Sequence, residues 1–140
     1  MAGLADIRPK LAGAITAAIT DAQCTGYVLA SPTSPFFDIE LAADGMEYDQ
    51  SAGNGIQKIS LTIRGCIVGF DLAQQKKLDE WTAPDGTRSL KQILEADGVL
   101  EEIPGQIHVG KASGYRLTQI AGSNTAYLGA EWAVEVFTQQ

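Results

Sequence analysis

The chain has 140 residues, of which 45% are hydrophobic and 19% are charged, and its formal net charge is -7. This length and composition predict a single folded domain, residues 1–140, with enough apolar side chains for one core. The acidic balance argues against nucleic-acid binding through a basic patch, and no apolar run approaches the roughly 20 residues of a membrane span. The N-terminal sequence lacks the apolar stretch of a secretion signal.

Apolar residues recur at helical spacing near the start of the chain and predict a helix over about residues 5–22. The apolar stripe consists of Leu4, Ile7, Leu11, Ile15, Ala18, Ile19 and Ala22. Asp6 is a candidate N-cap, and Pro9 is tolerated because it falls in the first turn. Residues 26–30 then form a short strand candidate, and the prolines within residues 31–35 favour an extended linker.

Alternation of apolar and polar residues predicts a second strand at residues 36–41. Its apolar face carries Phe37, Ile39 and Leu41. Residues 42–55 contain two glycine-rich turn sequences, so this segment is either a long loop or a hairpin with a short strand at residues 46–49. Long loops often carry functional contacts, and we therefore expect partner contacts in this segment first.

The longest predicted strand covers residues 57–70 and runs directly into a predicted helix at residues 71–81. One strand face is apolar and consists of Ile59, Leu61, Ile63 and Ile67. The other face starts polar and turns apolar at its far end; its residues are Lys58, Ser60, Thr62, Arg64, Cys66, Val68 and Phe70. Asp71 and Gln74 form a capping-box-like pair where the helix begins. A strand end that is apolar on both faces must be buried on both faces. We expect the chain's own helices to cover one face and a neighbouring molecule to cover the other.

A turn-rich connection at residues 82–88 leads to a second capping box, formed by Ser89 and Gln92. This box opens a short helix that Asp97 and Gly98 end. Trp81 and Trp132 fall at core-facing positions, so we expect both in the core and not as ligand-stacking residues.

The final third of the chain predicts three strands, at residues 106–111, 115–120 and 126–138. The last strand carries Leu128, Trp132, Val134 and Val136 on one face, with Glu131 and Glu135 on the other. Such alternation is typical of an antiparallel sheet with one face in water. The whole layout predicts an α+β fold of two layers, in which three helices cover one face of a mainly antiparallel sheet of about five strands.

The sequence shows no catalytic grouping, and we expect neither enzyme activity nor a cofactor or metal ion. His108 is the only histidine, which excludes a site built from several histidines. Residues 105–112 resemble a phosphate loop, but Ala112 stands where Ser or Thr would hold magnesium, and no helix follows. Cys24 and Cys66 fall in different predicted elements and predict free thiols. Three acidic residues lack the spacing of a calcium loop; they are Asp44, Glu47 and Asp49.

Seven segments, in the same order along most of the chain, resemble the tail terminator proteins of long-tailed (siphovirus-type) bacteriophages, particularly those of actinobacterial phages. They are residues 1–8, 30–33, 73–79, 83–86, 89–91, 112–116 and 128–136. None of these segments is a chemical motif, so the resemblance concerns fold and family. Residues 42–57 resemble the family least.

The resemblance implies a structural virion protein that forms a hexameric ring on the head-proximal end of the tail tube. Such a ring stops tube polymerisation and joins the tail to the head-completion proteins of the neck. The implied partners are further copies of the chain, the tail tube protein and a neck protein, with no membrane. DNA would only pass through the central channel, without specific binding, and the protein would be made in the host cytoplasm.

A closed ring requires two different patches on each subunit. We expect the apolar strand end to supply one patch, through Cys66, Val68 and Phe70, together with Tyr127 or Phe137. A loop that faces the channel or a partner is expected to carry Asp44, Met46, Glu47, Tyr48 and Asp49. Some acidic side chains would face the channel and keep DNA phosphates from adhering; the candidates are Asp44, Glu47, Asp49, Glu131 and Glu135.

Three other functions remain open at this point. The first is another head-tail connector or head-completion protein of the neck, whose small α+β domain would look similar. The second is a small enzyme whose active site lies between subunits. The third is an adaptor that binds a host protein through residues 42–55.

Overall fold

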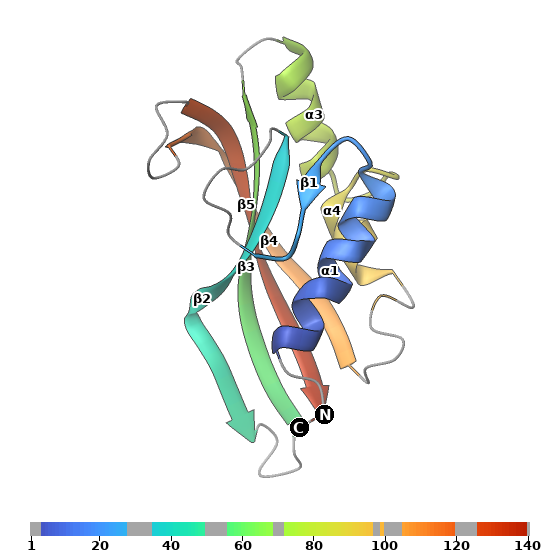
Figure 1. The fold of residues 1–140 in the computed structure, drawn as a ribbon, viewed down its shortest axis with the longest axis vertical. Helices are drawn as coiled ribbons and strands as arrows, with labels where there is room; N and C mark the ends of the chain where they lie inside the picture. Colours follow the sequence, from blue (N-terminus) through green and yellow to red (C-terminus); the bar gives the residue numbers. More distant parts are fainter. Residues whose placement is uncertain are drawn as a thin grey trace.

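The computed structural model describes residues 4–27, 35–49, 56–68, 72–96, 99, 105–119 and 126–139. In chain order the elements are α1 (Leu4–Ala18), β1 (Gln23–Cys24), β2 (Phe36–Asp49), β3 (Ile56–Val68), α3 (Leu72–Thr82), α4 (Leu90–Glu95), β4 (Gly105–Gln119) and β5 (Ala126–Gln139). The three helices of this described part lie on one side of the strands (Figure 1). The α+β class, with helices covering one face of a sheet, is therefore confirmed.

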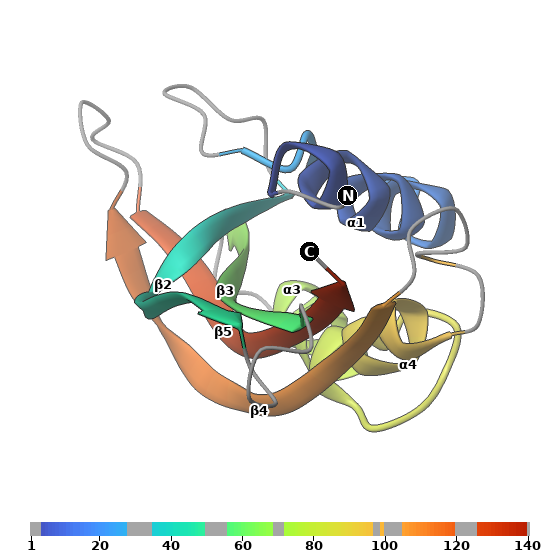
Figure 2. The same cartoon turned by 90° about the horizontal axis from the view of Figure 1, so that it is seen from below.

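The described strands form one five-stranded sheet in the order β1-β2-β3-β5-β4. β1 and β2 are parallel, whereas the pairs β2–β3, β3–β5 and β4–β5 are antiparallel. The mainly antiparallel sheet is as predicted. β3 lies in the middle and pairs with β5 from Ile56 to Val68, so the longest predicted strand is indeed the centre of the sheet. Seen from below, the long strands form a strongly curved layer (Figure 2).

One face of the sheet and the three described helices enclose the main hydrophobic core. The apolar face of β3 is buried as predicted; its members Ile59, Leu61, Ile63 and Ile67 are at most 1% exposed. The helices contribute Ile7, Leu11, Ile15, Leu78, Trp81, Leu90 and Leu94, and β5 contributes Ala130, Trp132, Val134 and Val136. The core positions predicted for both tryptophans are confirmed.

Gly65 of β3 lies beneath an aromatic group inside this core. The ring centroids of Phe37 and Trp81 are 4.5 Å apart, and those of Phe37 and Trp132 are 5.9 Å apart. A Cβ atom added at Gly65 would stand 2.8 Å from the Phe37 ring and 3.0 Å from the Trp132 ring. The glycine therefore leaves the space that the aromatic rings of β2 and β5 fill.

The first helix is shorter than predicted. α1 ends at Ala18 rather than near residue 22, although Ile19 and Ala22 are still buried in the core. The short parallel strand β1 follows at Gln23–Cys24 and not at the predicted residues 26–30, of which residues 28–30 lie outside the described part. The Gln23 amide donates to the Pro35 carbonyl at 2.9 Å, and this bond holds β1 beside β2.

A single carboxylate links the segment after α1 to the middle of α3 and to the residue before the N-cap of α4. Asp21, just after α1, accepts hydrogen bonds from Lys77 of α3 at 3.3 Å and from Arg88 at 2.7 Å. Arg88 immediately precedes Ser89, the N-cap of α4. The Ser89 hydroxyl accepts from the Gln92 amide at 3.3 Å as predicted, but the Gln92 side chain accepts from Gly86 instead of closing the capping box.

Two alternatives were predicted for residues 42–55, a long loop or a hairpin with a short strand at residues 46–49; the strand at residues 46–49 is confirmed, and the loop is wrong for residues 42–49. β2 continues from Phe36 to Asp49, so Asp44, Met46, Glu47, Tyr48 and Asp49 lie on a strand. An irregularity between Leu41 and Met46 absorbs the turn-like Asp44-Gly45 sequence, with Gly45 at a φ of 68°. Leu41, predicted for the core face, is 41% exposed. Residues 50–55 lie outside the described part.

The predicted pair of strands at residues 106–111 and 115–120 is one strand, β4, from Gly105 to Gln119. The small residues between the two predicted strands resemble a turn, but two register shifts against β5 accommodate them, one between Val109 and Lys111 and one between Ser113 and Arg116. β5 itself extends from Ala126 to Gln139, close to its predicted bounds. Because of these register shifts, β4 stays paired with β5 on both sides of each irregularity, whereas a turn would have reversed the direction of the chain.

Candidate functional site

The sheet face opposite the helices is the candidate functional surface, and we refer to it as the open face. Cross-strand neighbours in an antiparallel pair share a face, so the register defines its members. β2 contributes Phe36, Asp38, Glu40 and Glu47; β3 contributes Lys58, Ser60, Thr62, Arg64, Cys66 and Val68; β5 contributes Tyr127, Gly129, Glu131, Ala133, Glu135 and Phe137; β4 contributes His108, Lys111 and Ser113.

One end of the open face carries a small apolar cluster of Phe36, Cys66 and Tyr127. The rings of Phe36 and Tyr127 meet edge to face, with centroids 5.3 Å apart and an interplanar angle of 85°. Cys66 is 0% exposed and Tyr127 is 7% exposed, so both are covered mainly within their own chain. Val68, beside this cluster, is 42% exposed. Of the expected interface residues at this end, Val68 alone presents substantial surface among those described.

The other two expected interface residues do not join this cluster. Phe137 pairs with Lys58 in the register, near the opposite end of β3 from Val68 and Tyr127, and it is half-buried. Phe70 lies outside the described residues. The structure therefore brings together Cys66, Val68 and Tyr127 and separates Phe137 from them.

An ion pair lies next to the apolar cluster. Arg64 Nη2 is 2.5 Å from Asp38 Oδ2, and the side chains are 23% and 5% exposed. Burial lowers the pKa of Arg64, but its hydrogen bond and charge interaction with Asp38 outweigh burial, so the pKa is raised overall. Glu131 stands opposite Arg64 in the register. The middle part of the open face thus carries the cation Arg64 between the carboxylates Asp38 and Glu131.

The far half of the open face is also charged. Lys58 Nζ lies 3.6 Å from Glu47 Oε2 and 3.6 Å from Glu135 Oε1. Glu47, Glu131 and Glu135, expected near the channel, therefore share one sheet face. Met46 packs against the main core instead. The side chains of Asp44, Tyr48 and Asp49 lie outside the description, although their backbone belongs to β2.

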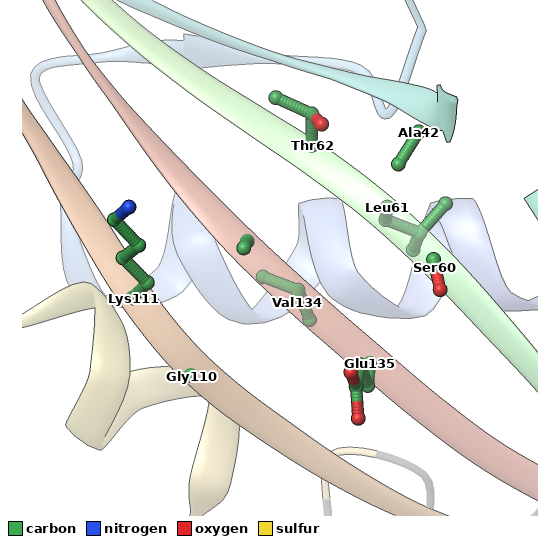
Figure 3. Close-up of a pocket in the computed structure, with 9 residues that line it drawn as sticks. Ala42, Ser60, Leu61, Thr62, Gly110, Lys111, Val134 and Glu135 are labelled. Carbon is green, nitrogen blue, oxygen red and sulfur yellow. The ribbon is translucent and has the colours of Figure 1, made fainter. Parts of the chain in front are cut away.

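A shallow hollow of about 260 Å³ lies in the centre of this face. Small residues from four strands line it, and Lys111 and Glu135 stand at its border; the small residues are Ala42, Ser60, Thr62, Gly110 and Ala133. Figure 3 shows these residues on the strands, with helices behind the sheet. The hollow exists because small side chains gather there, and it lacks the convergent polar groups of a typical ligand site.

The described residues offer little for catalysis. No group of three or more His, Cys, Asp or Glu residues among them could hold a metal ion. His108 is on β4, its side chain is 58% exposed, and its Nδ1 lies 3.7 Å from Glu95 Oε2. Burial raises the pKa of Cys24 to about 11 and that of Cys66 to about 12, so neither thiol is a ready nucleophile at neutral pH. Both cysteines are free, as predicted.

Sequence reasoning missed two members of the open face, Phe36 and Asp38. Phe37, next to Phe36, accounts for the apolar face of β2 on its own. Asp38 lies on the polar side of the alternation with Phe37 and Ile39, yet it is 4% exposed. A signal for Phe36 was present, since two adjacent aromatic residues in a strand imply apolar contacts on both faces.

Comparison with known proteins does not assign the chain to a family. No family model matches the sequence, and no curated protein matches it either. None of the helices in the described ranges is long and apolar enough to cross a membrane.

Proposed function

We propose that the chain is a tail terminator subunit of a long-tailed bacteriophage. In this proposal it forms a hexameric ring on the head-proximal end of the tail tube, stops tube polymerisation and joins the tail to the neck. The protein acts in the virion through its interfaces and has no catalytic role. DNA passes through the ring without being bound specifically.

The observation that best supports this proposal is the division of the sheet into two unlike faces. The helices and the main core occupy one face, while the open face carries ion pairs, a small apolar cluster and the exposed Val68. A surface of this kind suits contact with other proteins better than binding of a small molecule. The seven segments that resemble tail terminators, in the same order along the chain, supply the specific identity.

The ring needs two different patches, and the open face offers one that is continuous across β2, β3 and β5. The acidic residues Glu47, Glu131 and Glu135 lie on this face together, and the net charge of the whole chain is -7. An acidic lining would repel DNA phosphates and let DNA slide past. Among the described residues, the open face as a whole carries more carboxylates than cations, and this excess supports a channel-facing position; the carboxylates are Asp38, Glu40, Glu47, Glu131 and Glu135, and the cations are Lys58, Arg64 and Lys111.

A reconstitution experiment tests the function directly. Purified tail tube protein polymerises in the presence or absence of this chain, and electron microscopy records tube length and the appearance of tube ends. We expect capped tubes that no longer grow, with the chain at one end only. Tubes of unchanged growth and bare ends would refute the terminator role, and binding to a neck protein but not to tubes would favour a head-completion protein.

A further inference from the structure

The connection between α3 and α4 contains an aspartate followed by a glycine, Asp85 and Gly86. Both residues are exposed to solvent. Gly86 has a φ of 112°, a conformation that favours glycine, and nothing lies within 4 Å of the position that a Cβ atom would take there. The turn therefore calls for glycine after Asp85, and the space around this glycine is open.

In an aspartate that precedes a glycine, the side-chain carboxyl group can react with the next main-chain nitrogen, because glycine has no side chain to hinder the approach. Here the Gly86 nitrogen would form a bond to Asp85 Cγ and lose its proton, while the carboxyl group loses its hydroxyl. One water molecule leaves, and a five-membered succinimide ring remains. A second water then adds to the main-chain carbonyl carbon of Asp85, and the bond from this carbon to the Gly86 nitrogen breaks. The chain now continues through Cγ as isoaspartate, with unchanged composition and no oxidation or reduction.

One hydrogen bond of the folded chain opposes this reaction. The Gly86 amide donates to Gln92 Oε1 at 2.8 Å. Gln92 lies in the first turn of α4, where its own amide donates to the hydroxyl of the N-cap Ser89. The bond retains the proton that the Gly86 nitrogen must lose before it attacks, and it directs this nitrogen towards α4. The Gln92 side chain thus binds the attacking nitrogen instead of closing the capping box.

The same turn fixes the start of α4. The Gly86 carbonyl accepts from the Ser89 amide at 3.1 Å, and the Ser89 hydroxyl donates to the Ala83 carbonyl. Arg88, in the same turn, donates to Asp21 at 2.7 Å. An isoaspartate adds one carbon atom to the main chain inside this turn, so it changes the length of the segment that carries these contacts.

We propose that Asp85 is a site of spontaneous isoaspartate formation and that the Gln92 side chain slows this modification in the folded protein. Water is the only co-reactant, and the reaction needs no enzyme. The modification disturbs the turn before Ser89 and thereby weakens the contacts at the start of α4. This inference does not rest on the proposed function.

Gln92→Met tests the protective hydrogen bond, because methionine has a similar length and helix propensity but no acceptor comparable with Oε1. Trypsin releases residues 78–88 as the same peptide from the native chain and from this variant, and the peptide contains a single Asp-Gly pair. Mass spectrometry with electron-transfer fragmentation measures the isoaspartate content of this peptide after prolonged incubation of the folded protein at neutral pH. We expect isoaspartate to accumulate about two- to tenfold faster in Gln92→Met than in the native chain, the factor that one ordinary hydrogen bond contributes.

Gln92→Glu is the matched control, because its carboxylate still accepts from the Gly86 amide, and it should react as slowly as the native chain. In guanidinium chloride, where the hydrogen bond is absent, all three chains should react at one rate that exceeds the rate of the folded native chain. Hydrogen exchange of the Gly86 amide should accelerate in Gln92→Met, whereas the amides of β3 should exchange as in the native protein. If Gln92→Met does not fold, the comparison of the folded and the unfolded native chain still tests the protection.

A folded Gln92→Met protein that forms isoaspartate at the native rate overturns the protective role, as does a Gln92→Glu protein that reacts as fast as Gln92→Met. A folded native chain that reacts as fast as the unfolded chain overturns it too. An unfolded chain that forms no isoaspartate at Asp85 overturns the site itself. The modified protein, separated by ion exchange, should melt at a lower temperature than the unmodified protein, and equal melting temperatures would overturn the effect on α4.

Discussion

Arg64 of β3 and Asp38 of β2 form an ion pair of 2.5 Å on the open face, and the Asp38 side chain is only 5% exposed. Replacing Asp38 by Ala leaves the guanidinium of Arg64 partly buried without its partner. We expect Asp38→Ala to lower the free energy of unfolding by about 2–3 kcal/mol, somewhat less than the roughly 3–5 kcal/mol of a fully buried pair. Urea unfolding followed by circular dichroism measures this loss.

Glu40→Ala is the matched control for Asp38→Ala, because Glu40 lies on the same strand and the same face but is exposed. This variant should change the free energy of unfolding by less than about 0.5 kcal/mol. Equal effects of the two substitutions would show that the burial of Asp38 does not matter.

Gly65 and Gly13 should respond in opposite ways to substitution by Ala. At Gly65 the added Cβ would stand 2.8 Å from the Phe37 ring, so Gly65→Ala should lower the free energy of unfolding by about 1–3 kcal/mol. At Gly13, an exposed position inside α1, nothing lies within 4 Å of the added atom. Gly13→Ala should raise the free energy of unfolding by about 0.4–1 kcal/mol. Thermal melting of both variants tests this contrast, and a stabilised Gly65→Ala protein would contradict the close aromatic packing.

The contacts of Asp21 make stability depend on pH in the acid range. Burial raises the pKa of Asp21, but its hydrogen bonds with Arg88 and Lys77 outweigh burial, so the pKa lies below the ordinary value of 3.8. The ionised carboxylate therefore stabilises the fold above pH 3.8, and this contribution is lost as the pH falls through the lowered pKa.

We therefore expect Asp21→Asn to lower the free energy of unfolding at neutral pH by about 0.5–1 kcal/mol, as for a partly exposed ion pair. The difference from the native protein should shrink towards zero in strong acid, where the native carboxylate is protonated as well. Urea unfolding curves recorded across the acid range measure it. A difference that stays constant down to the lowest pH would mean that the charge of Asp21 is not the cause.

The two thiols should be slow to react in the folded protein. Burial raises the pKa of Cys66 to about 12 and that of Cys24 to about 11, and Cys66 is 0% exposed. In mildly alkaline buffer we expect Ellman's reagent to modify Cys66 more slowly than Cys24, and both rapidly in urea. The single-thiol variants Cys24→Ser and Cys66→Ser separate the two rates. Fast modification of Cys66 in the folded chain would contradict the cluster that it forms with Phe36 and Tyr127.

Periodicity predicted the inner face of the sheet well because burial on one face imposes a period of two residues. It placed Ile59, Leu61 and Ile63 in the core and located the N-cap Ser89. The lengths of β2 and β4 were not predictable in this way. Their glycine-containing segments look like turns locally, and only pairing with the straight neighbours β3 and β5 keeps them extended.

The contacts of the candidate surface were harder to predict, because they join residues distant in the sequence. The cluster of Phe36, Cys66 and Tyr127 depends on the register of three strands, which alternation alone does not set. Two hydrogen bonds at the strand edges were likewise not predictable, one from Arg8 to the Ile39 carbonyl and one from the Val109 amide to Glu95. Nothing in the local sequence links Arg8 or Glu95 to a strand edge.

Arg8 joins three parts of the molecule, since its guanidinium reaches the carbonyls of Gly26 and Ile39 and lies 4.8 Å from the centre of the Tyr27 ring. Detachment of α1 from the sheet would therefore also release the edge of β2 beside Ile39. An exposed edge next to Phe36 and Phe37 is the kind of segment that starts irregular aggregation. Arg8 thus links the docking of α1 to the protection of the β2 edge against aggregation.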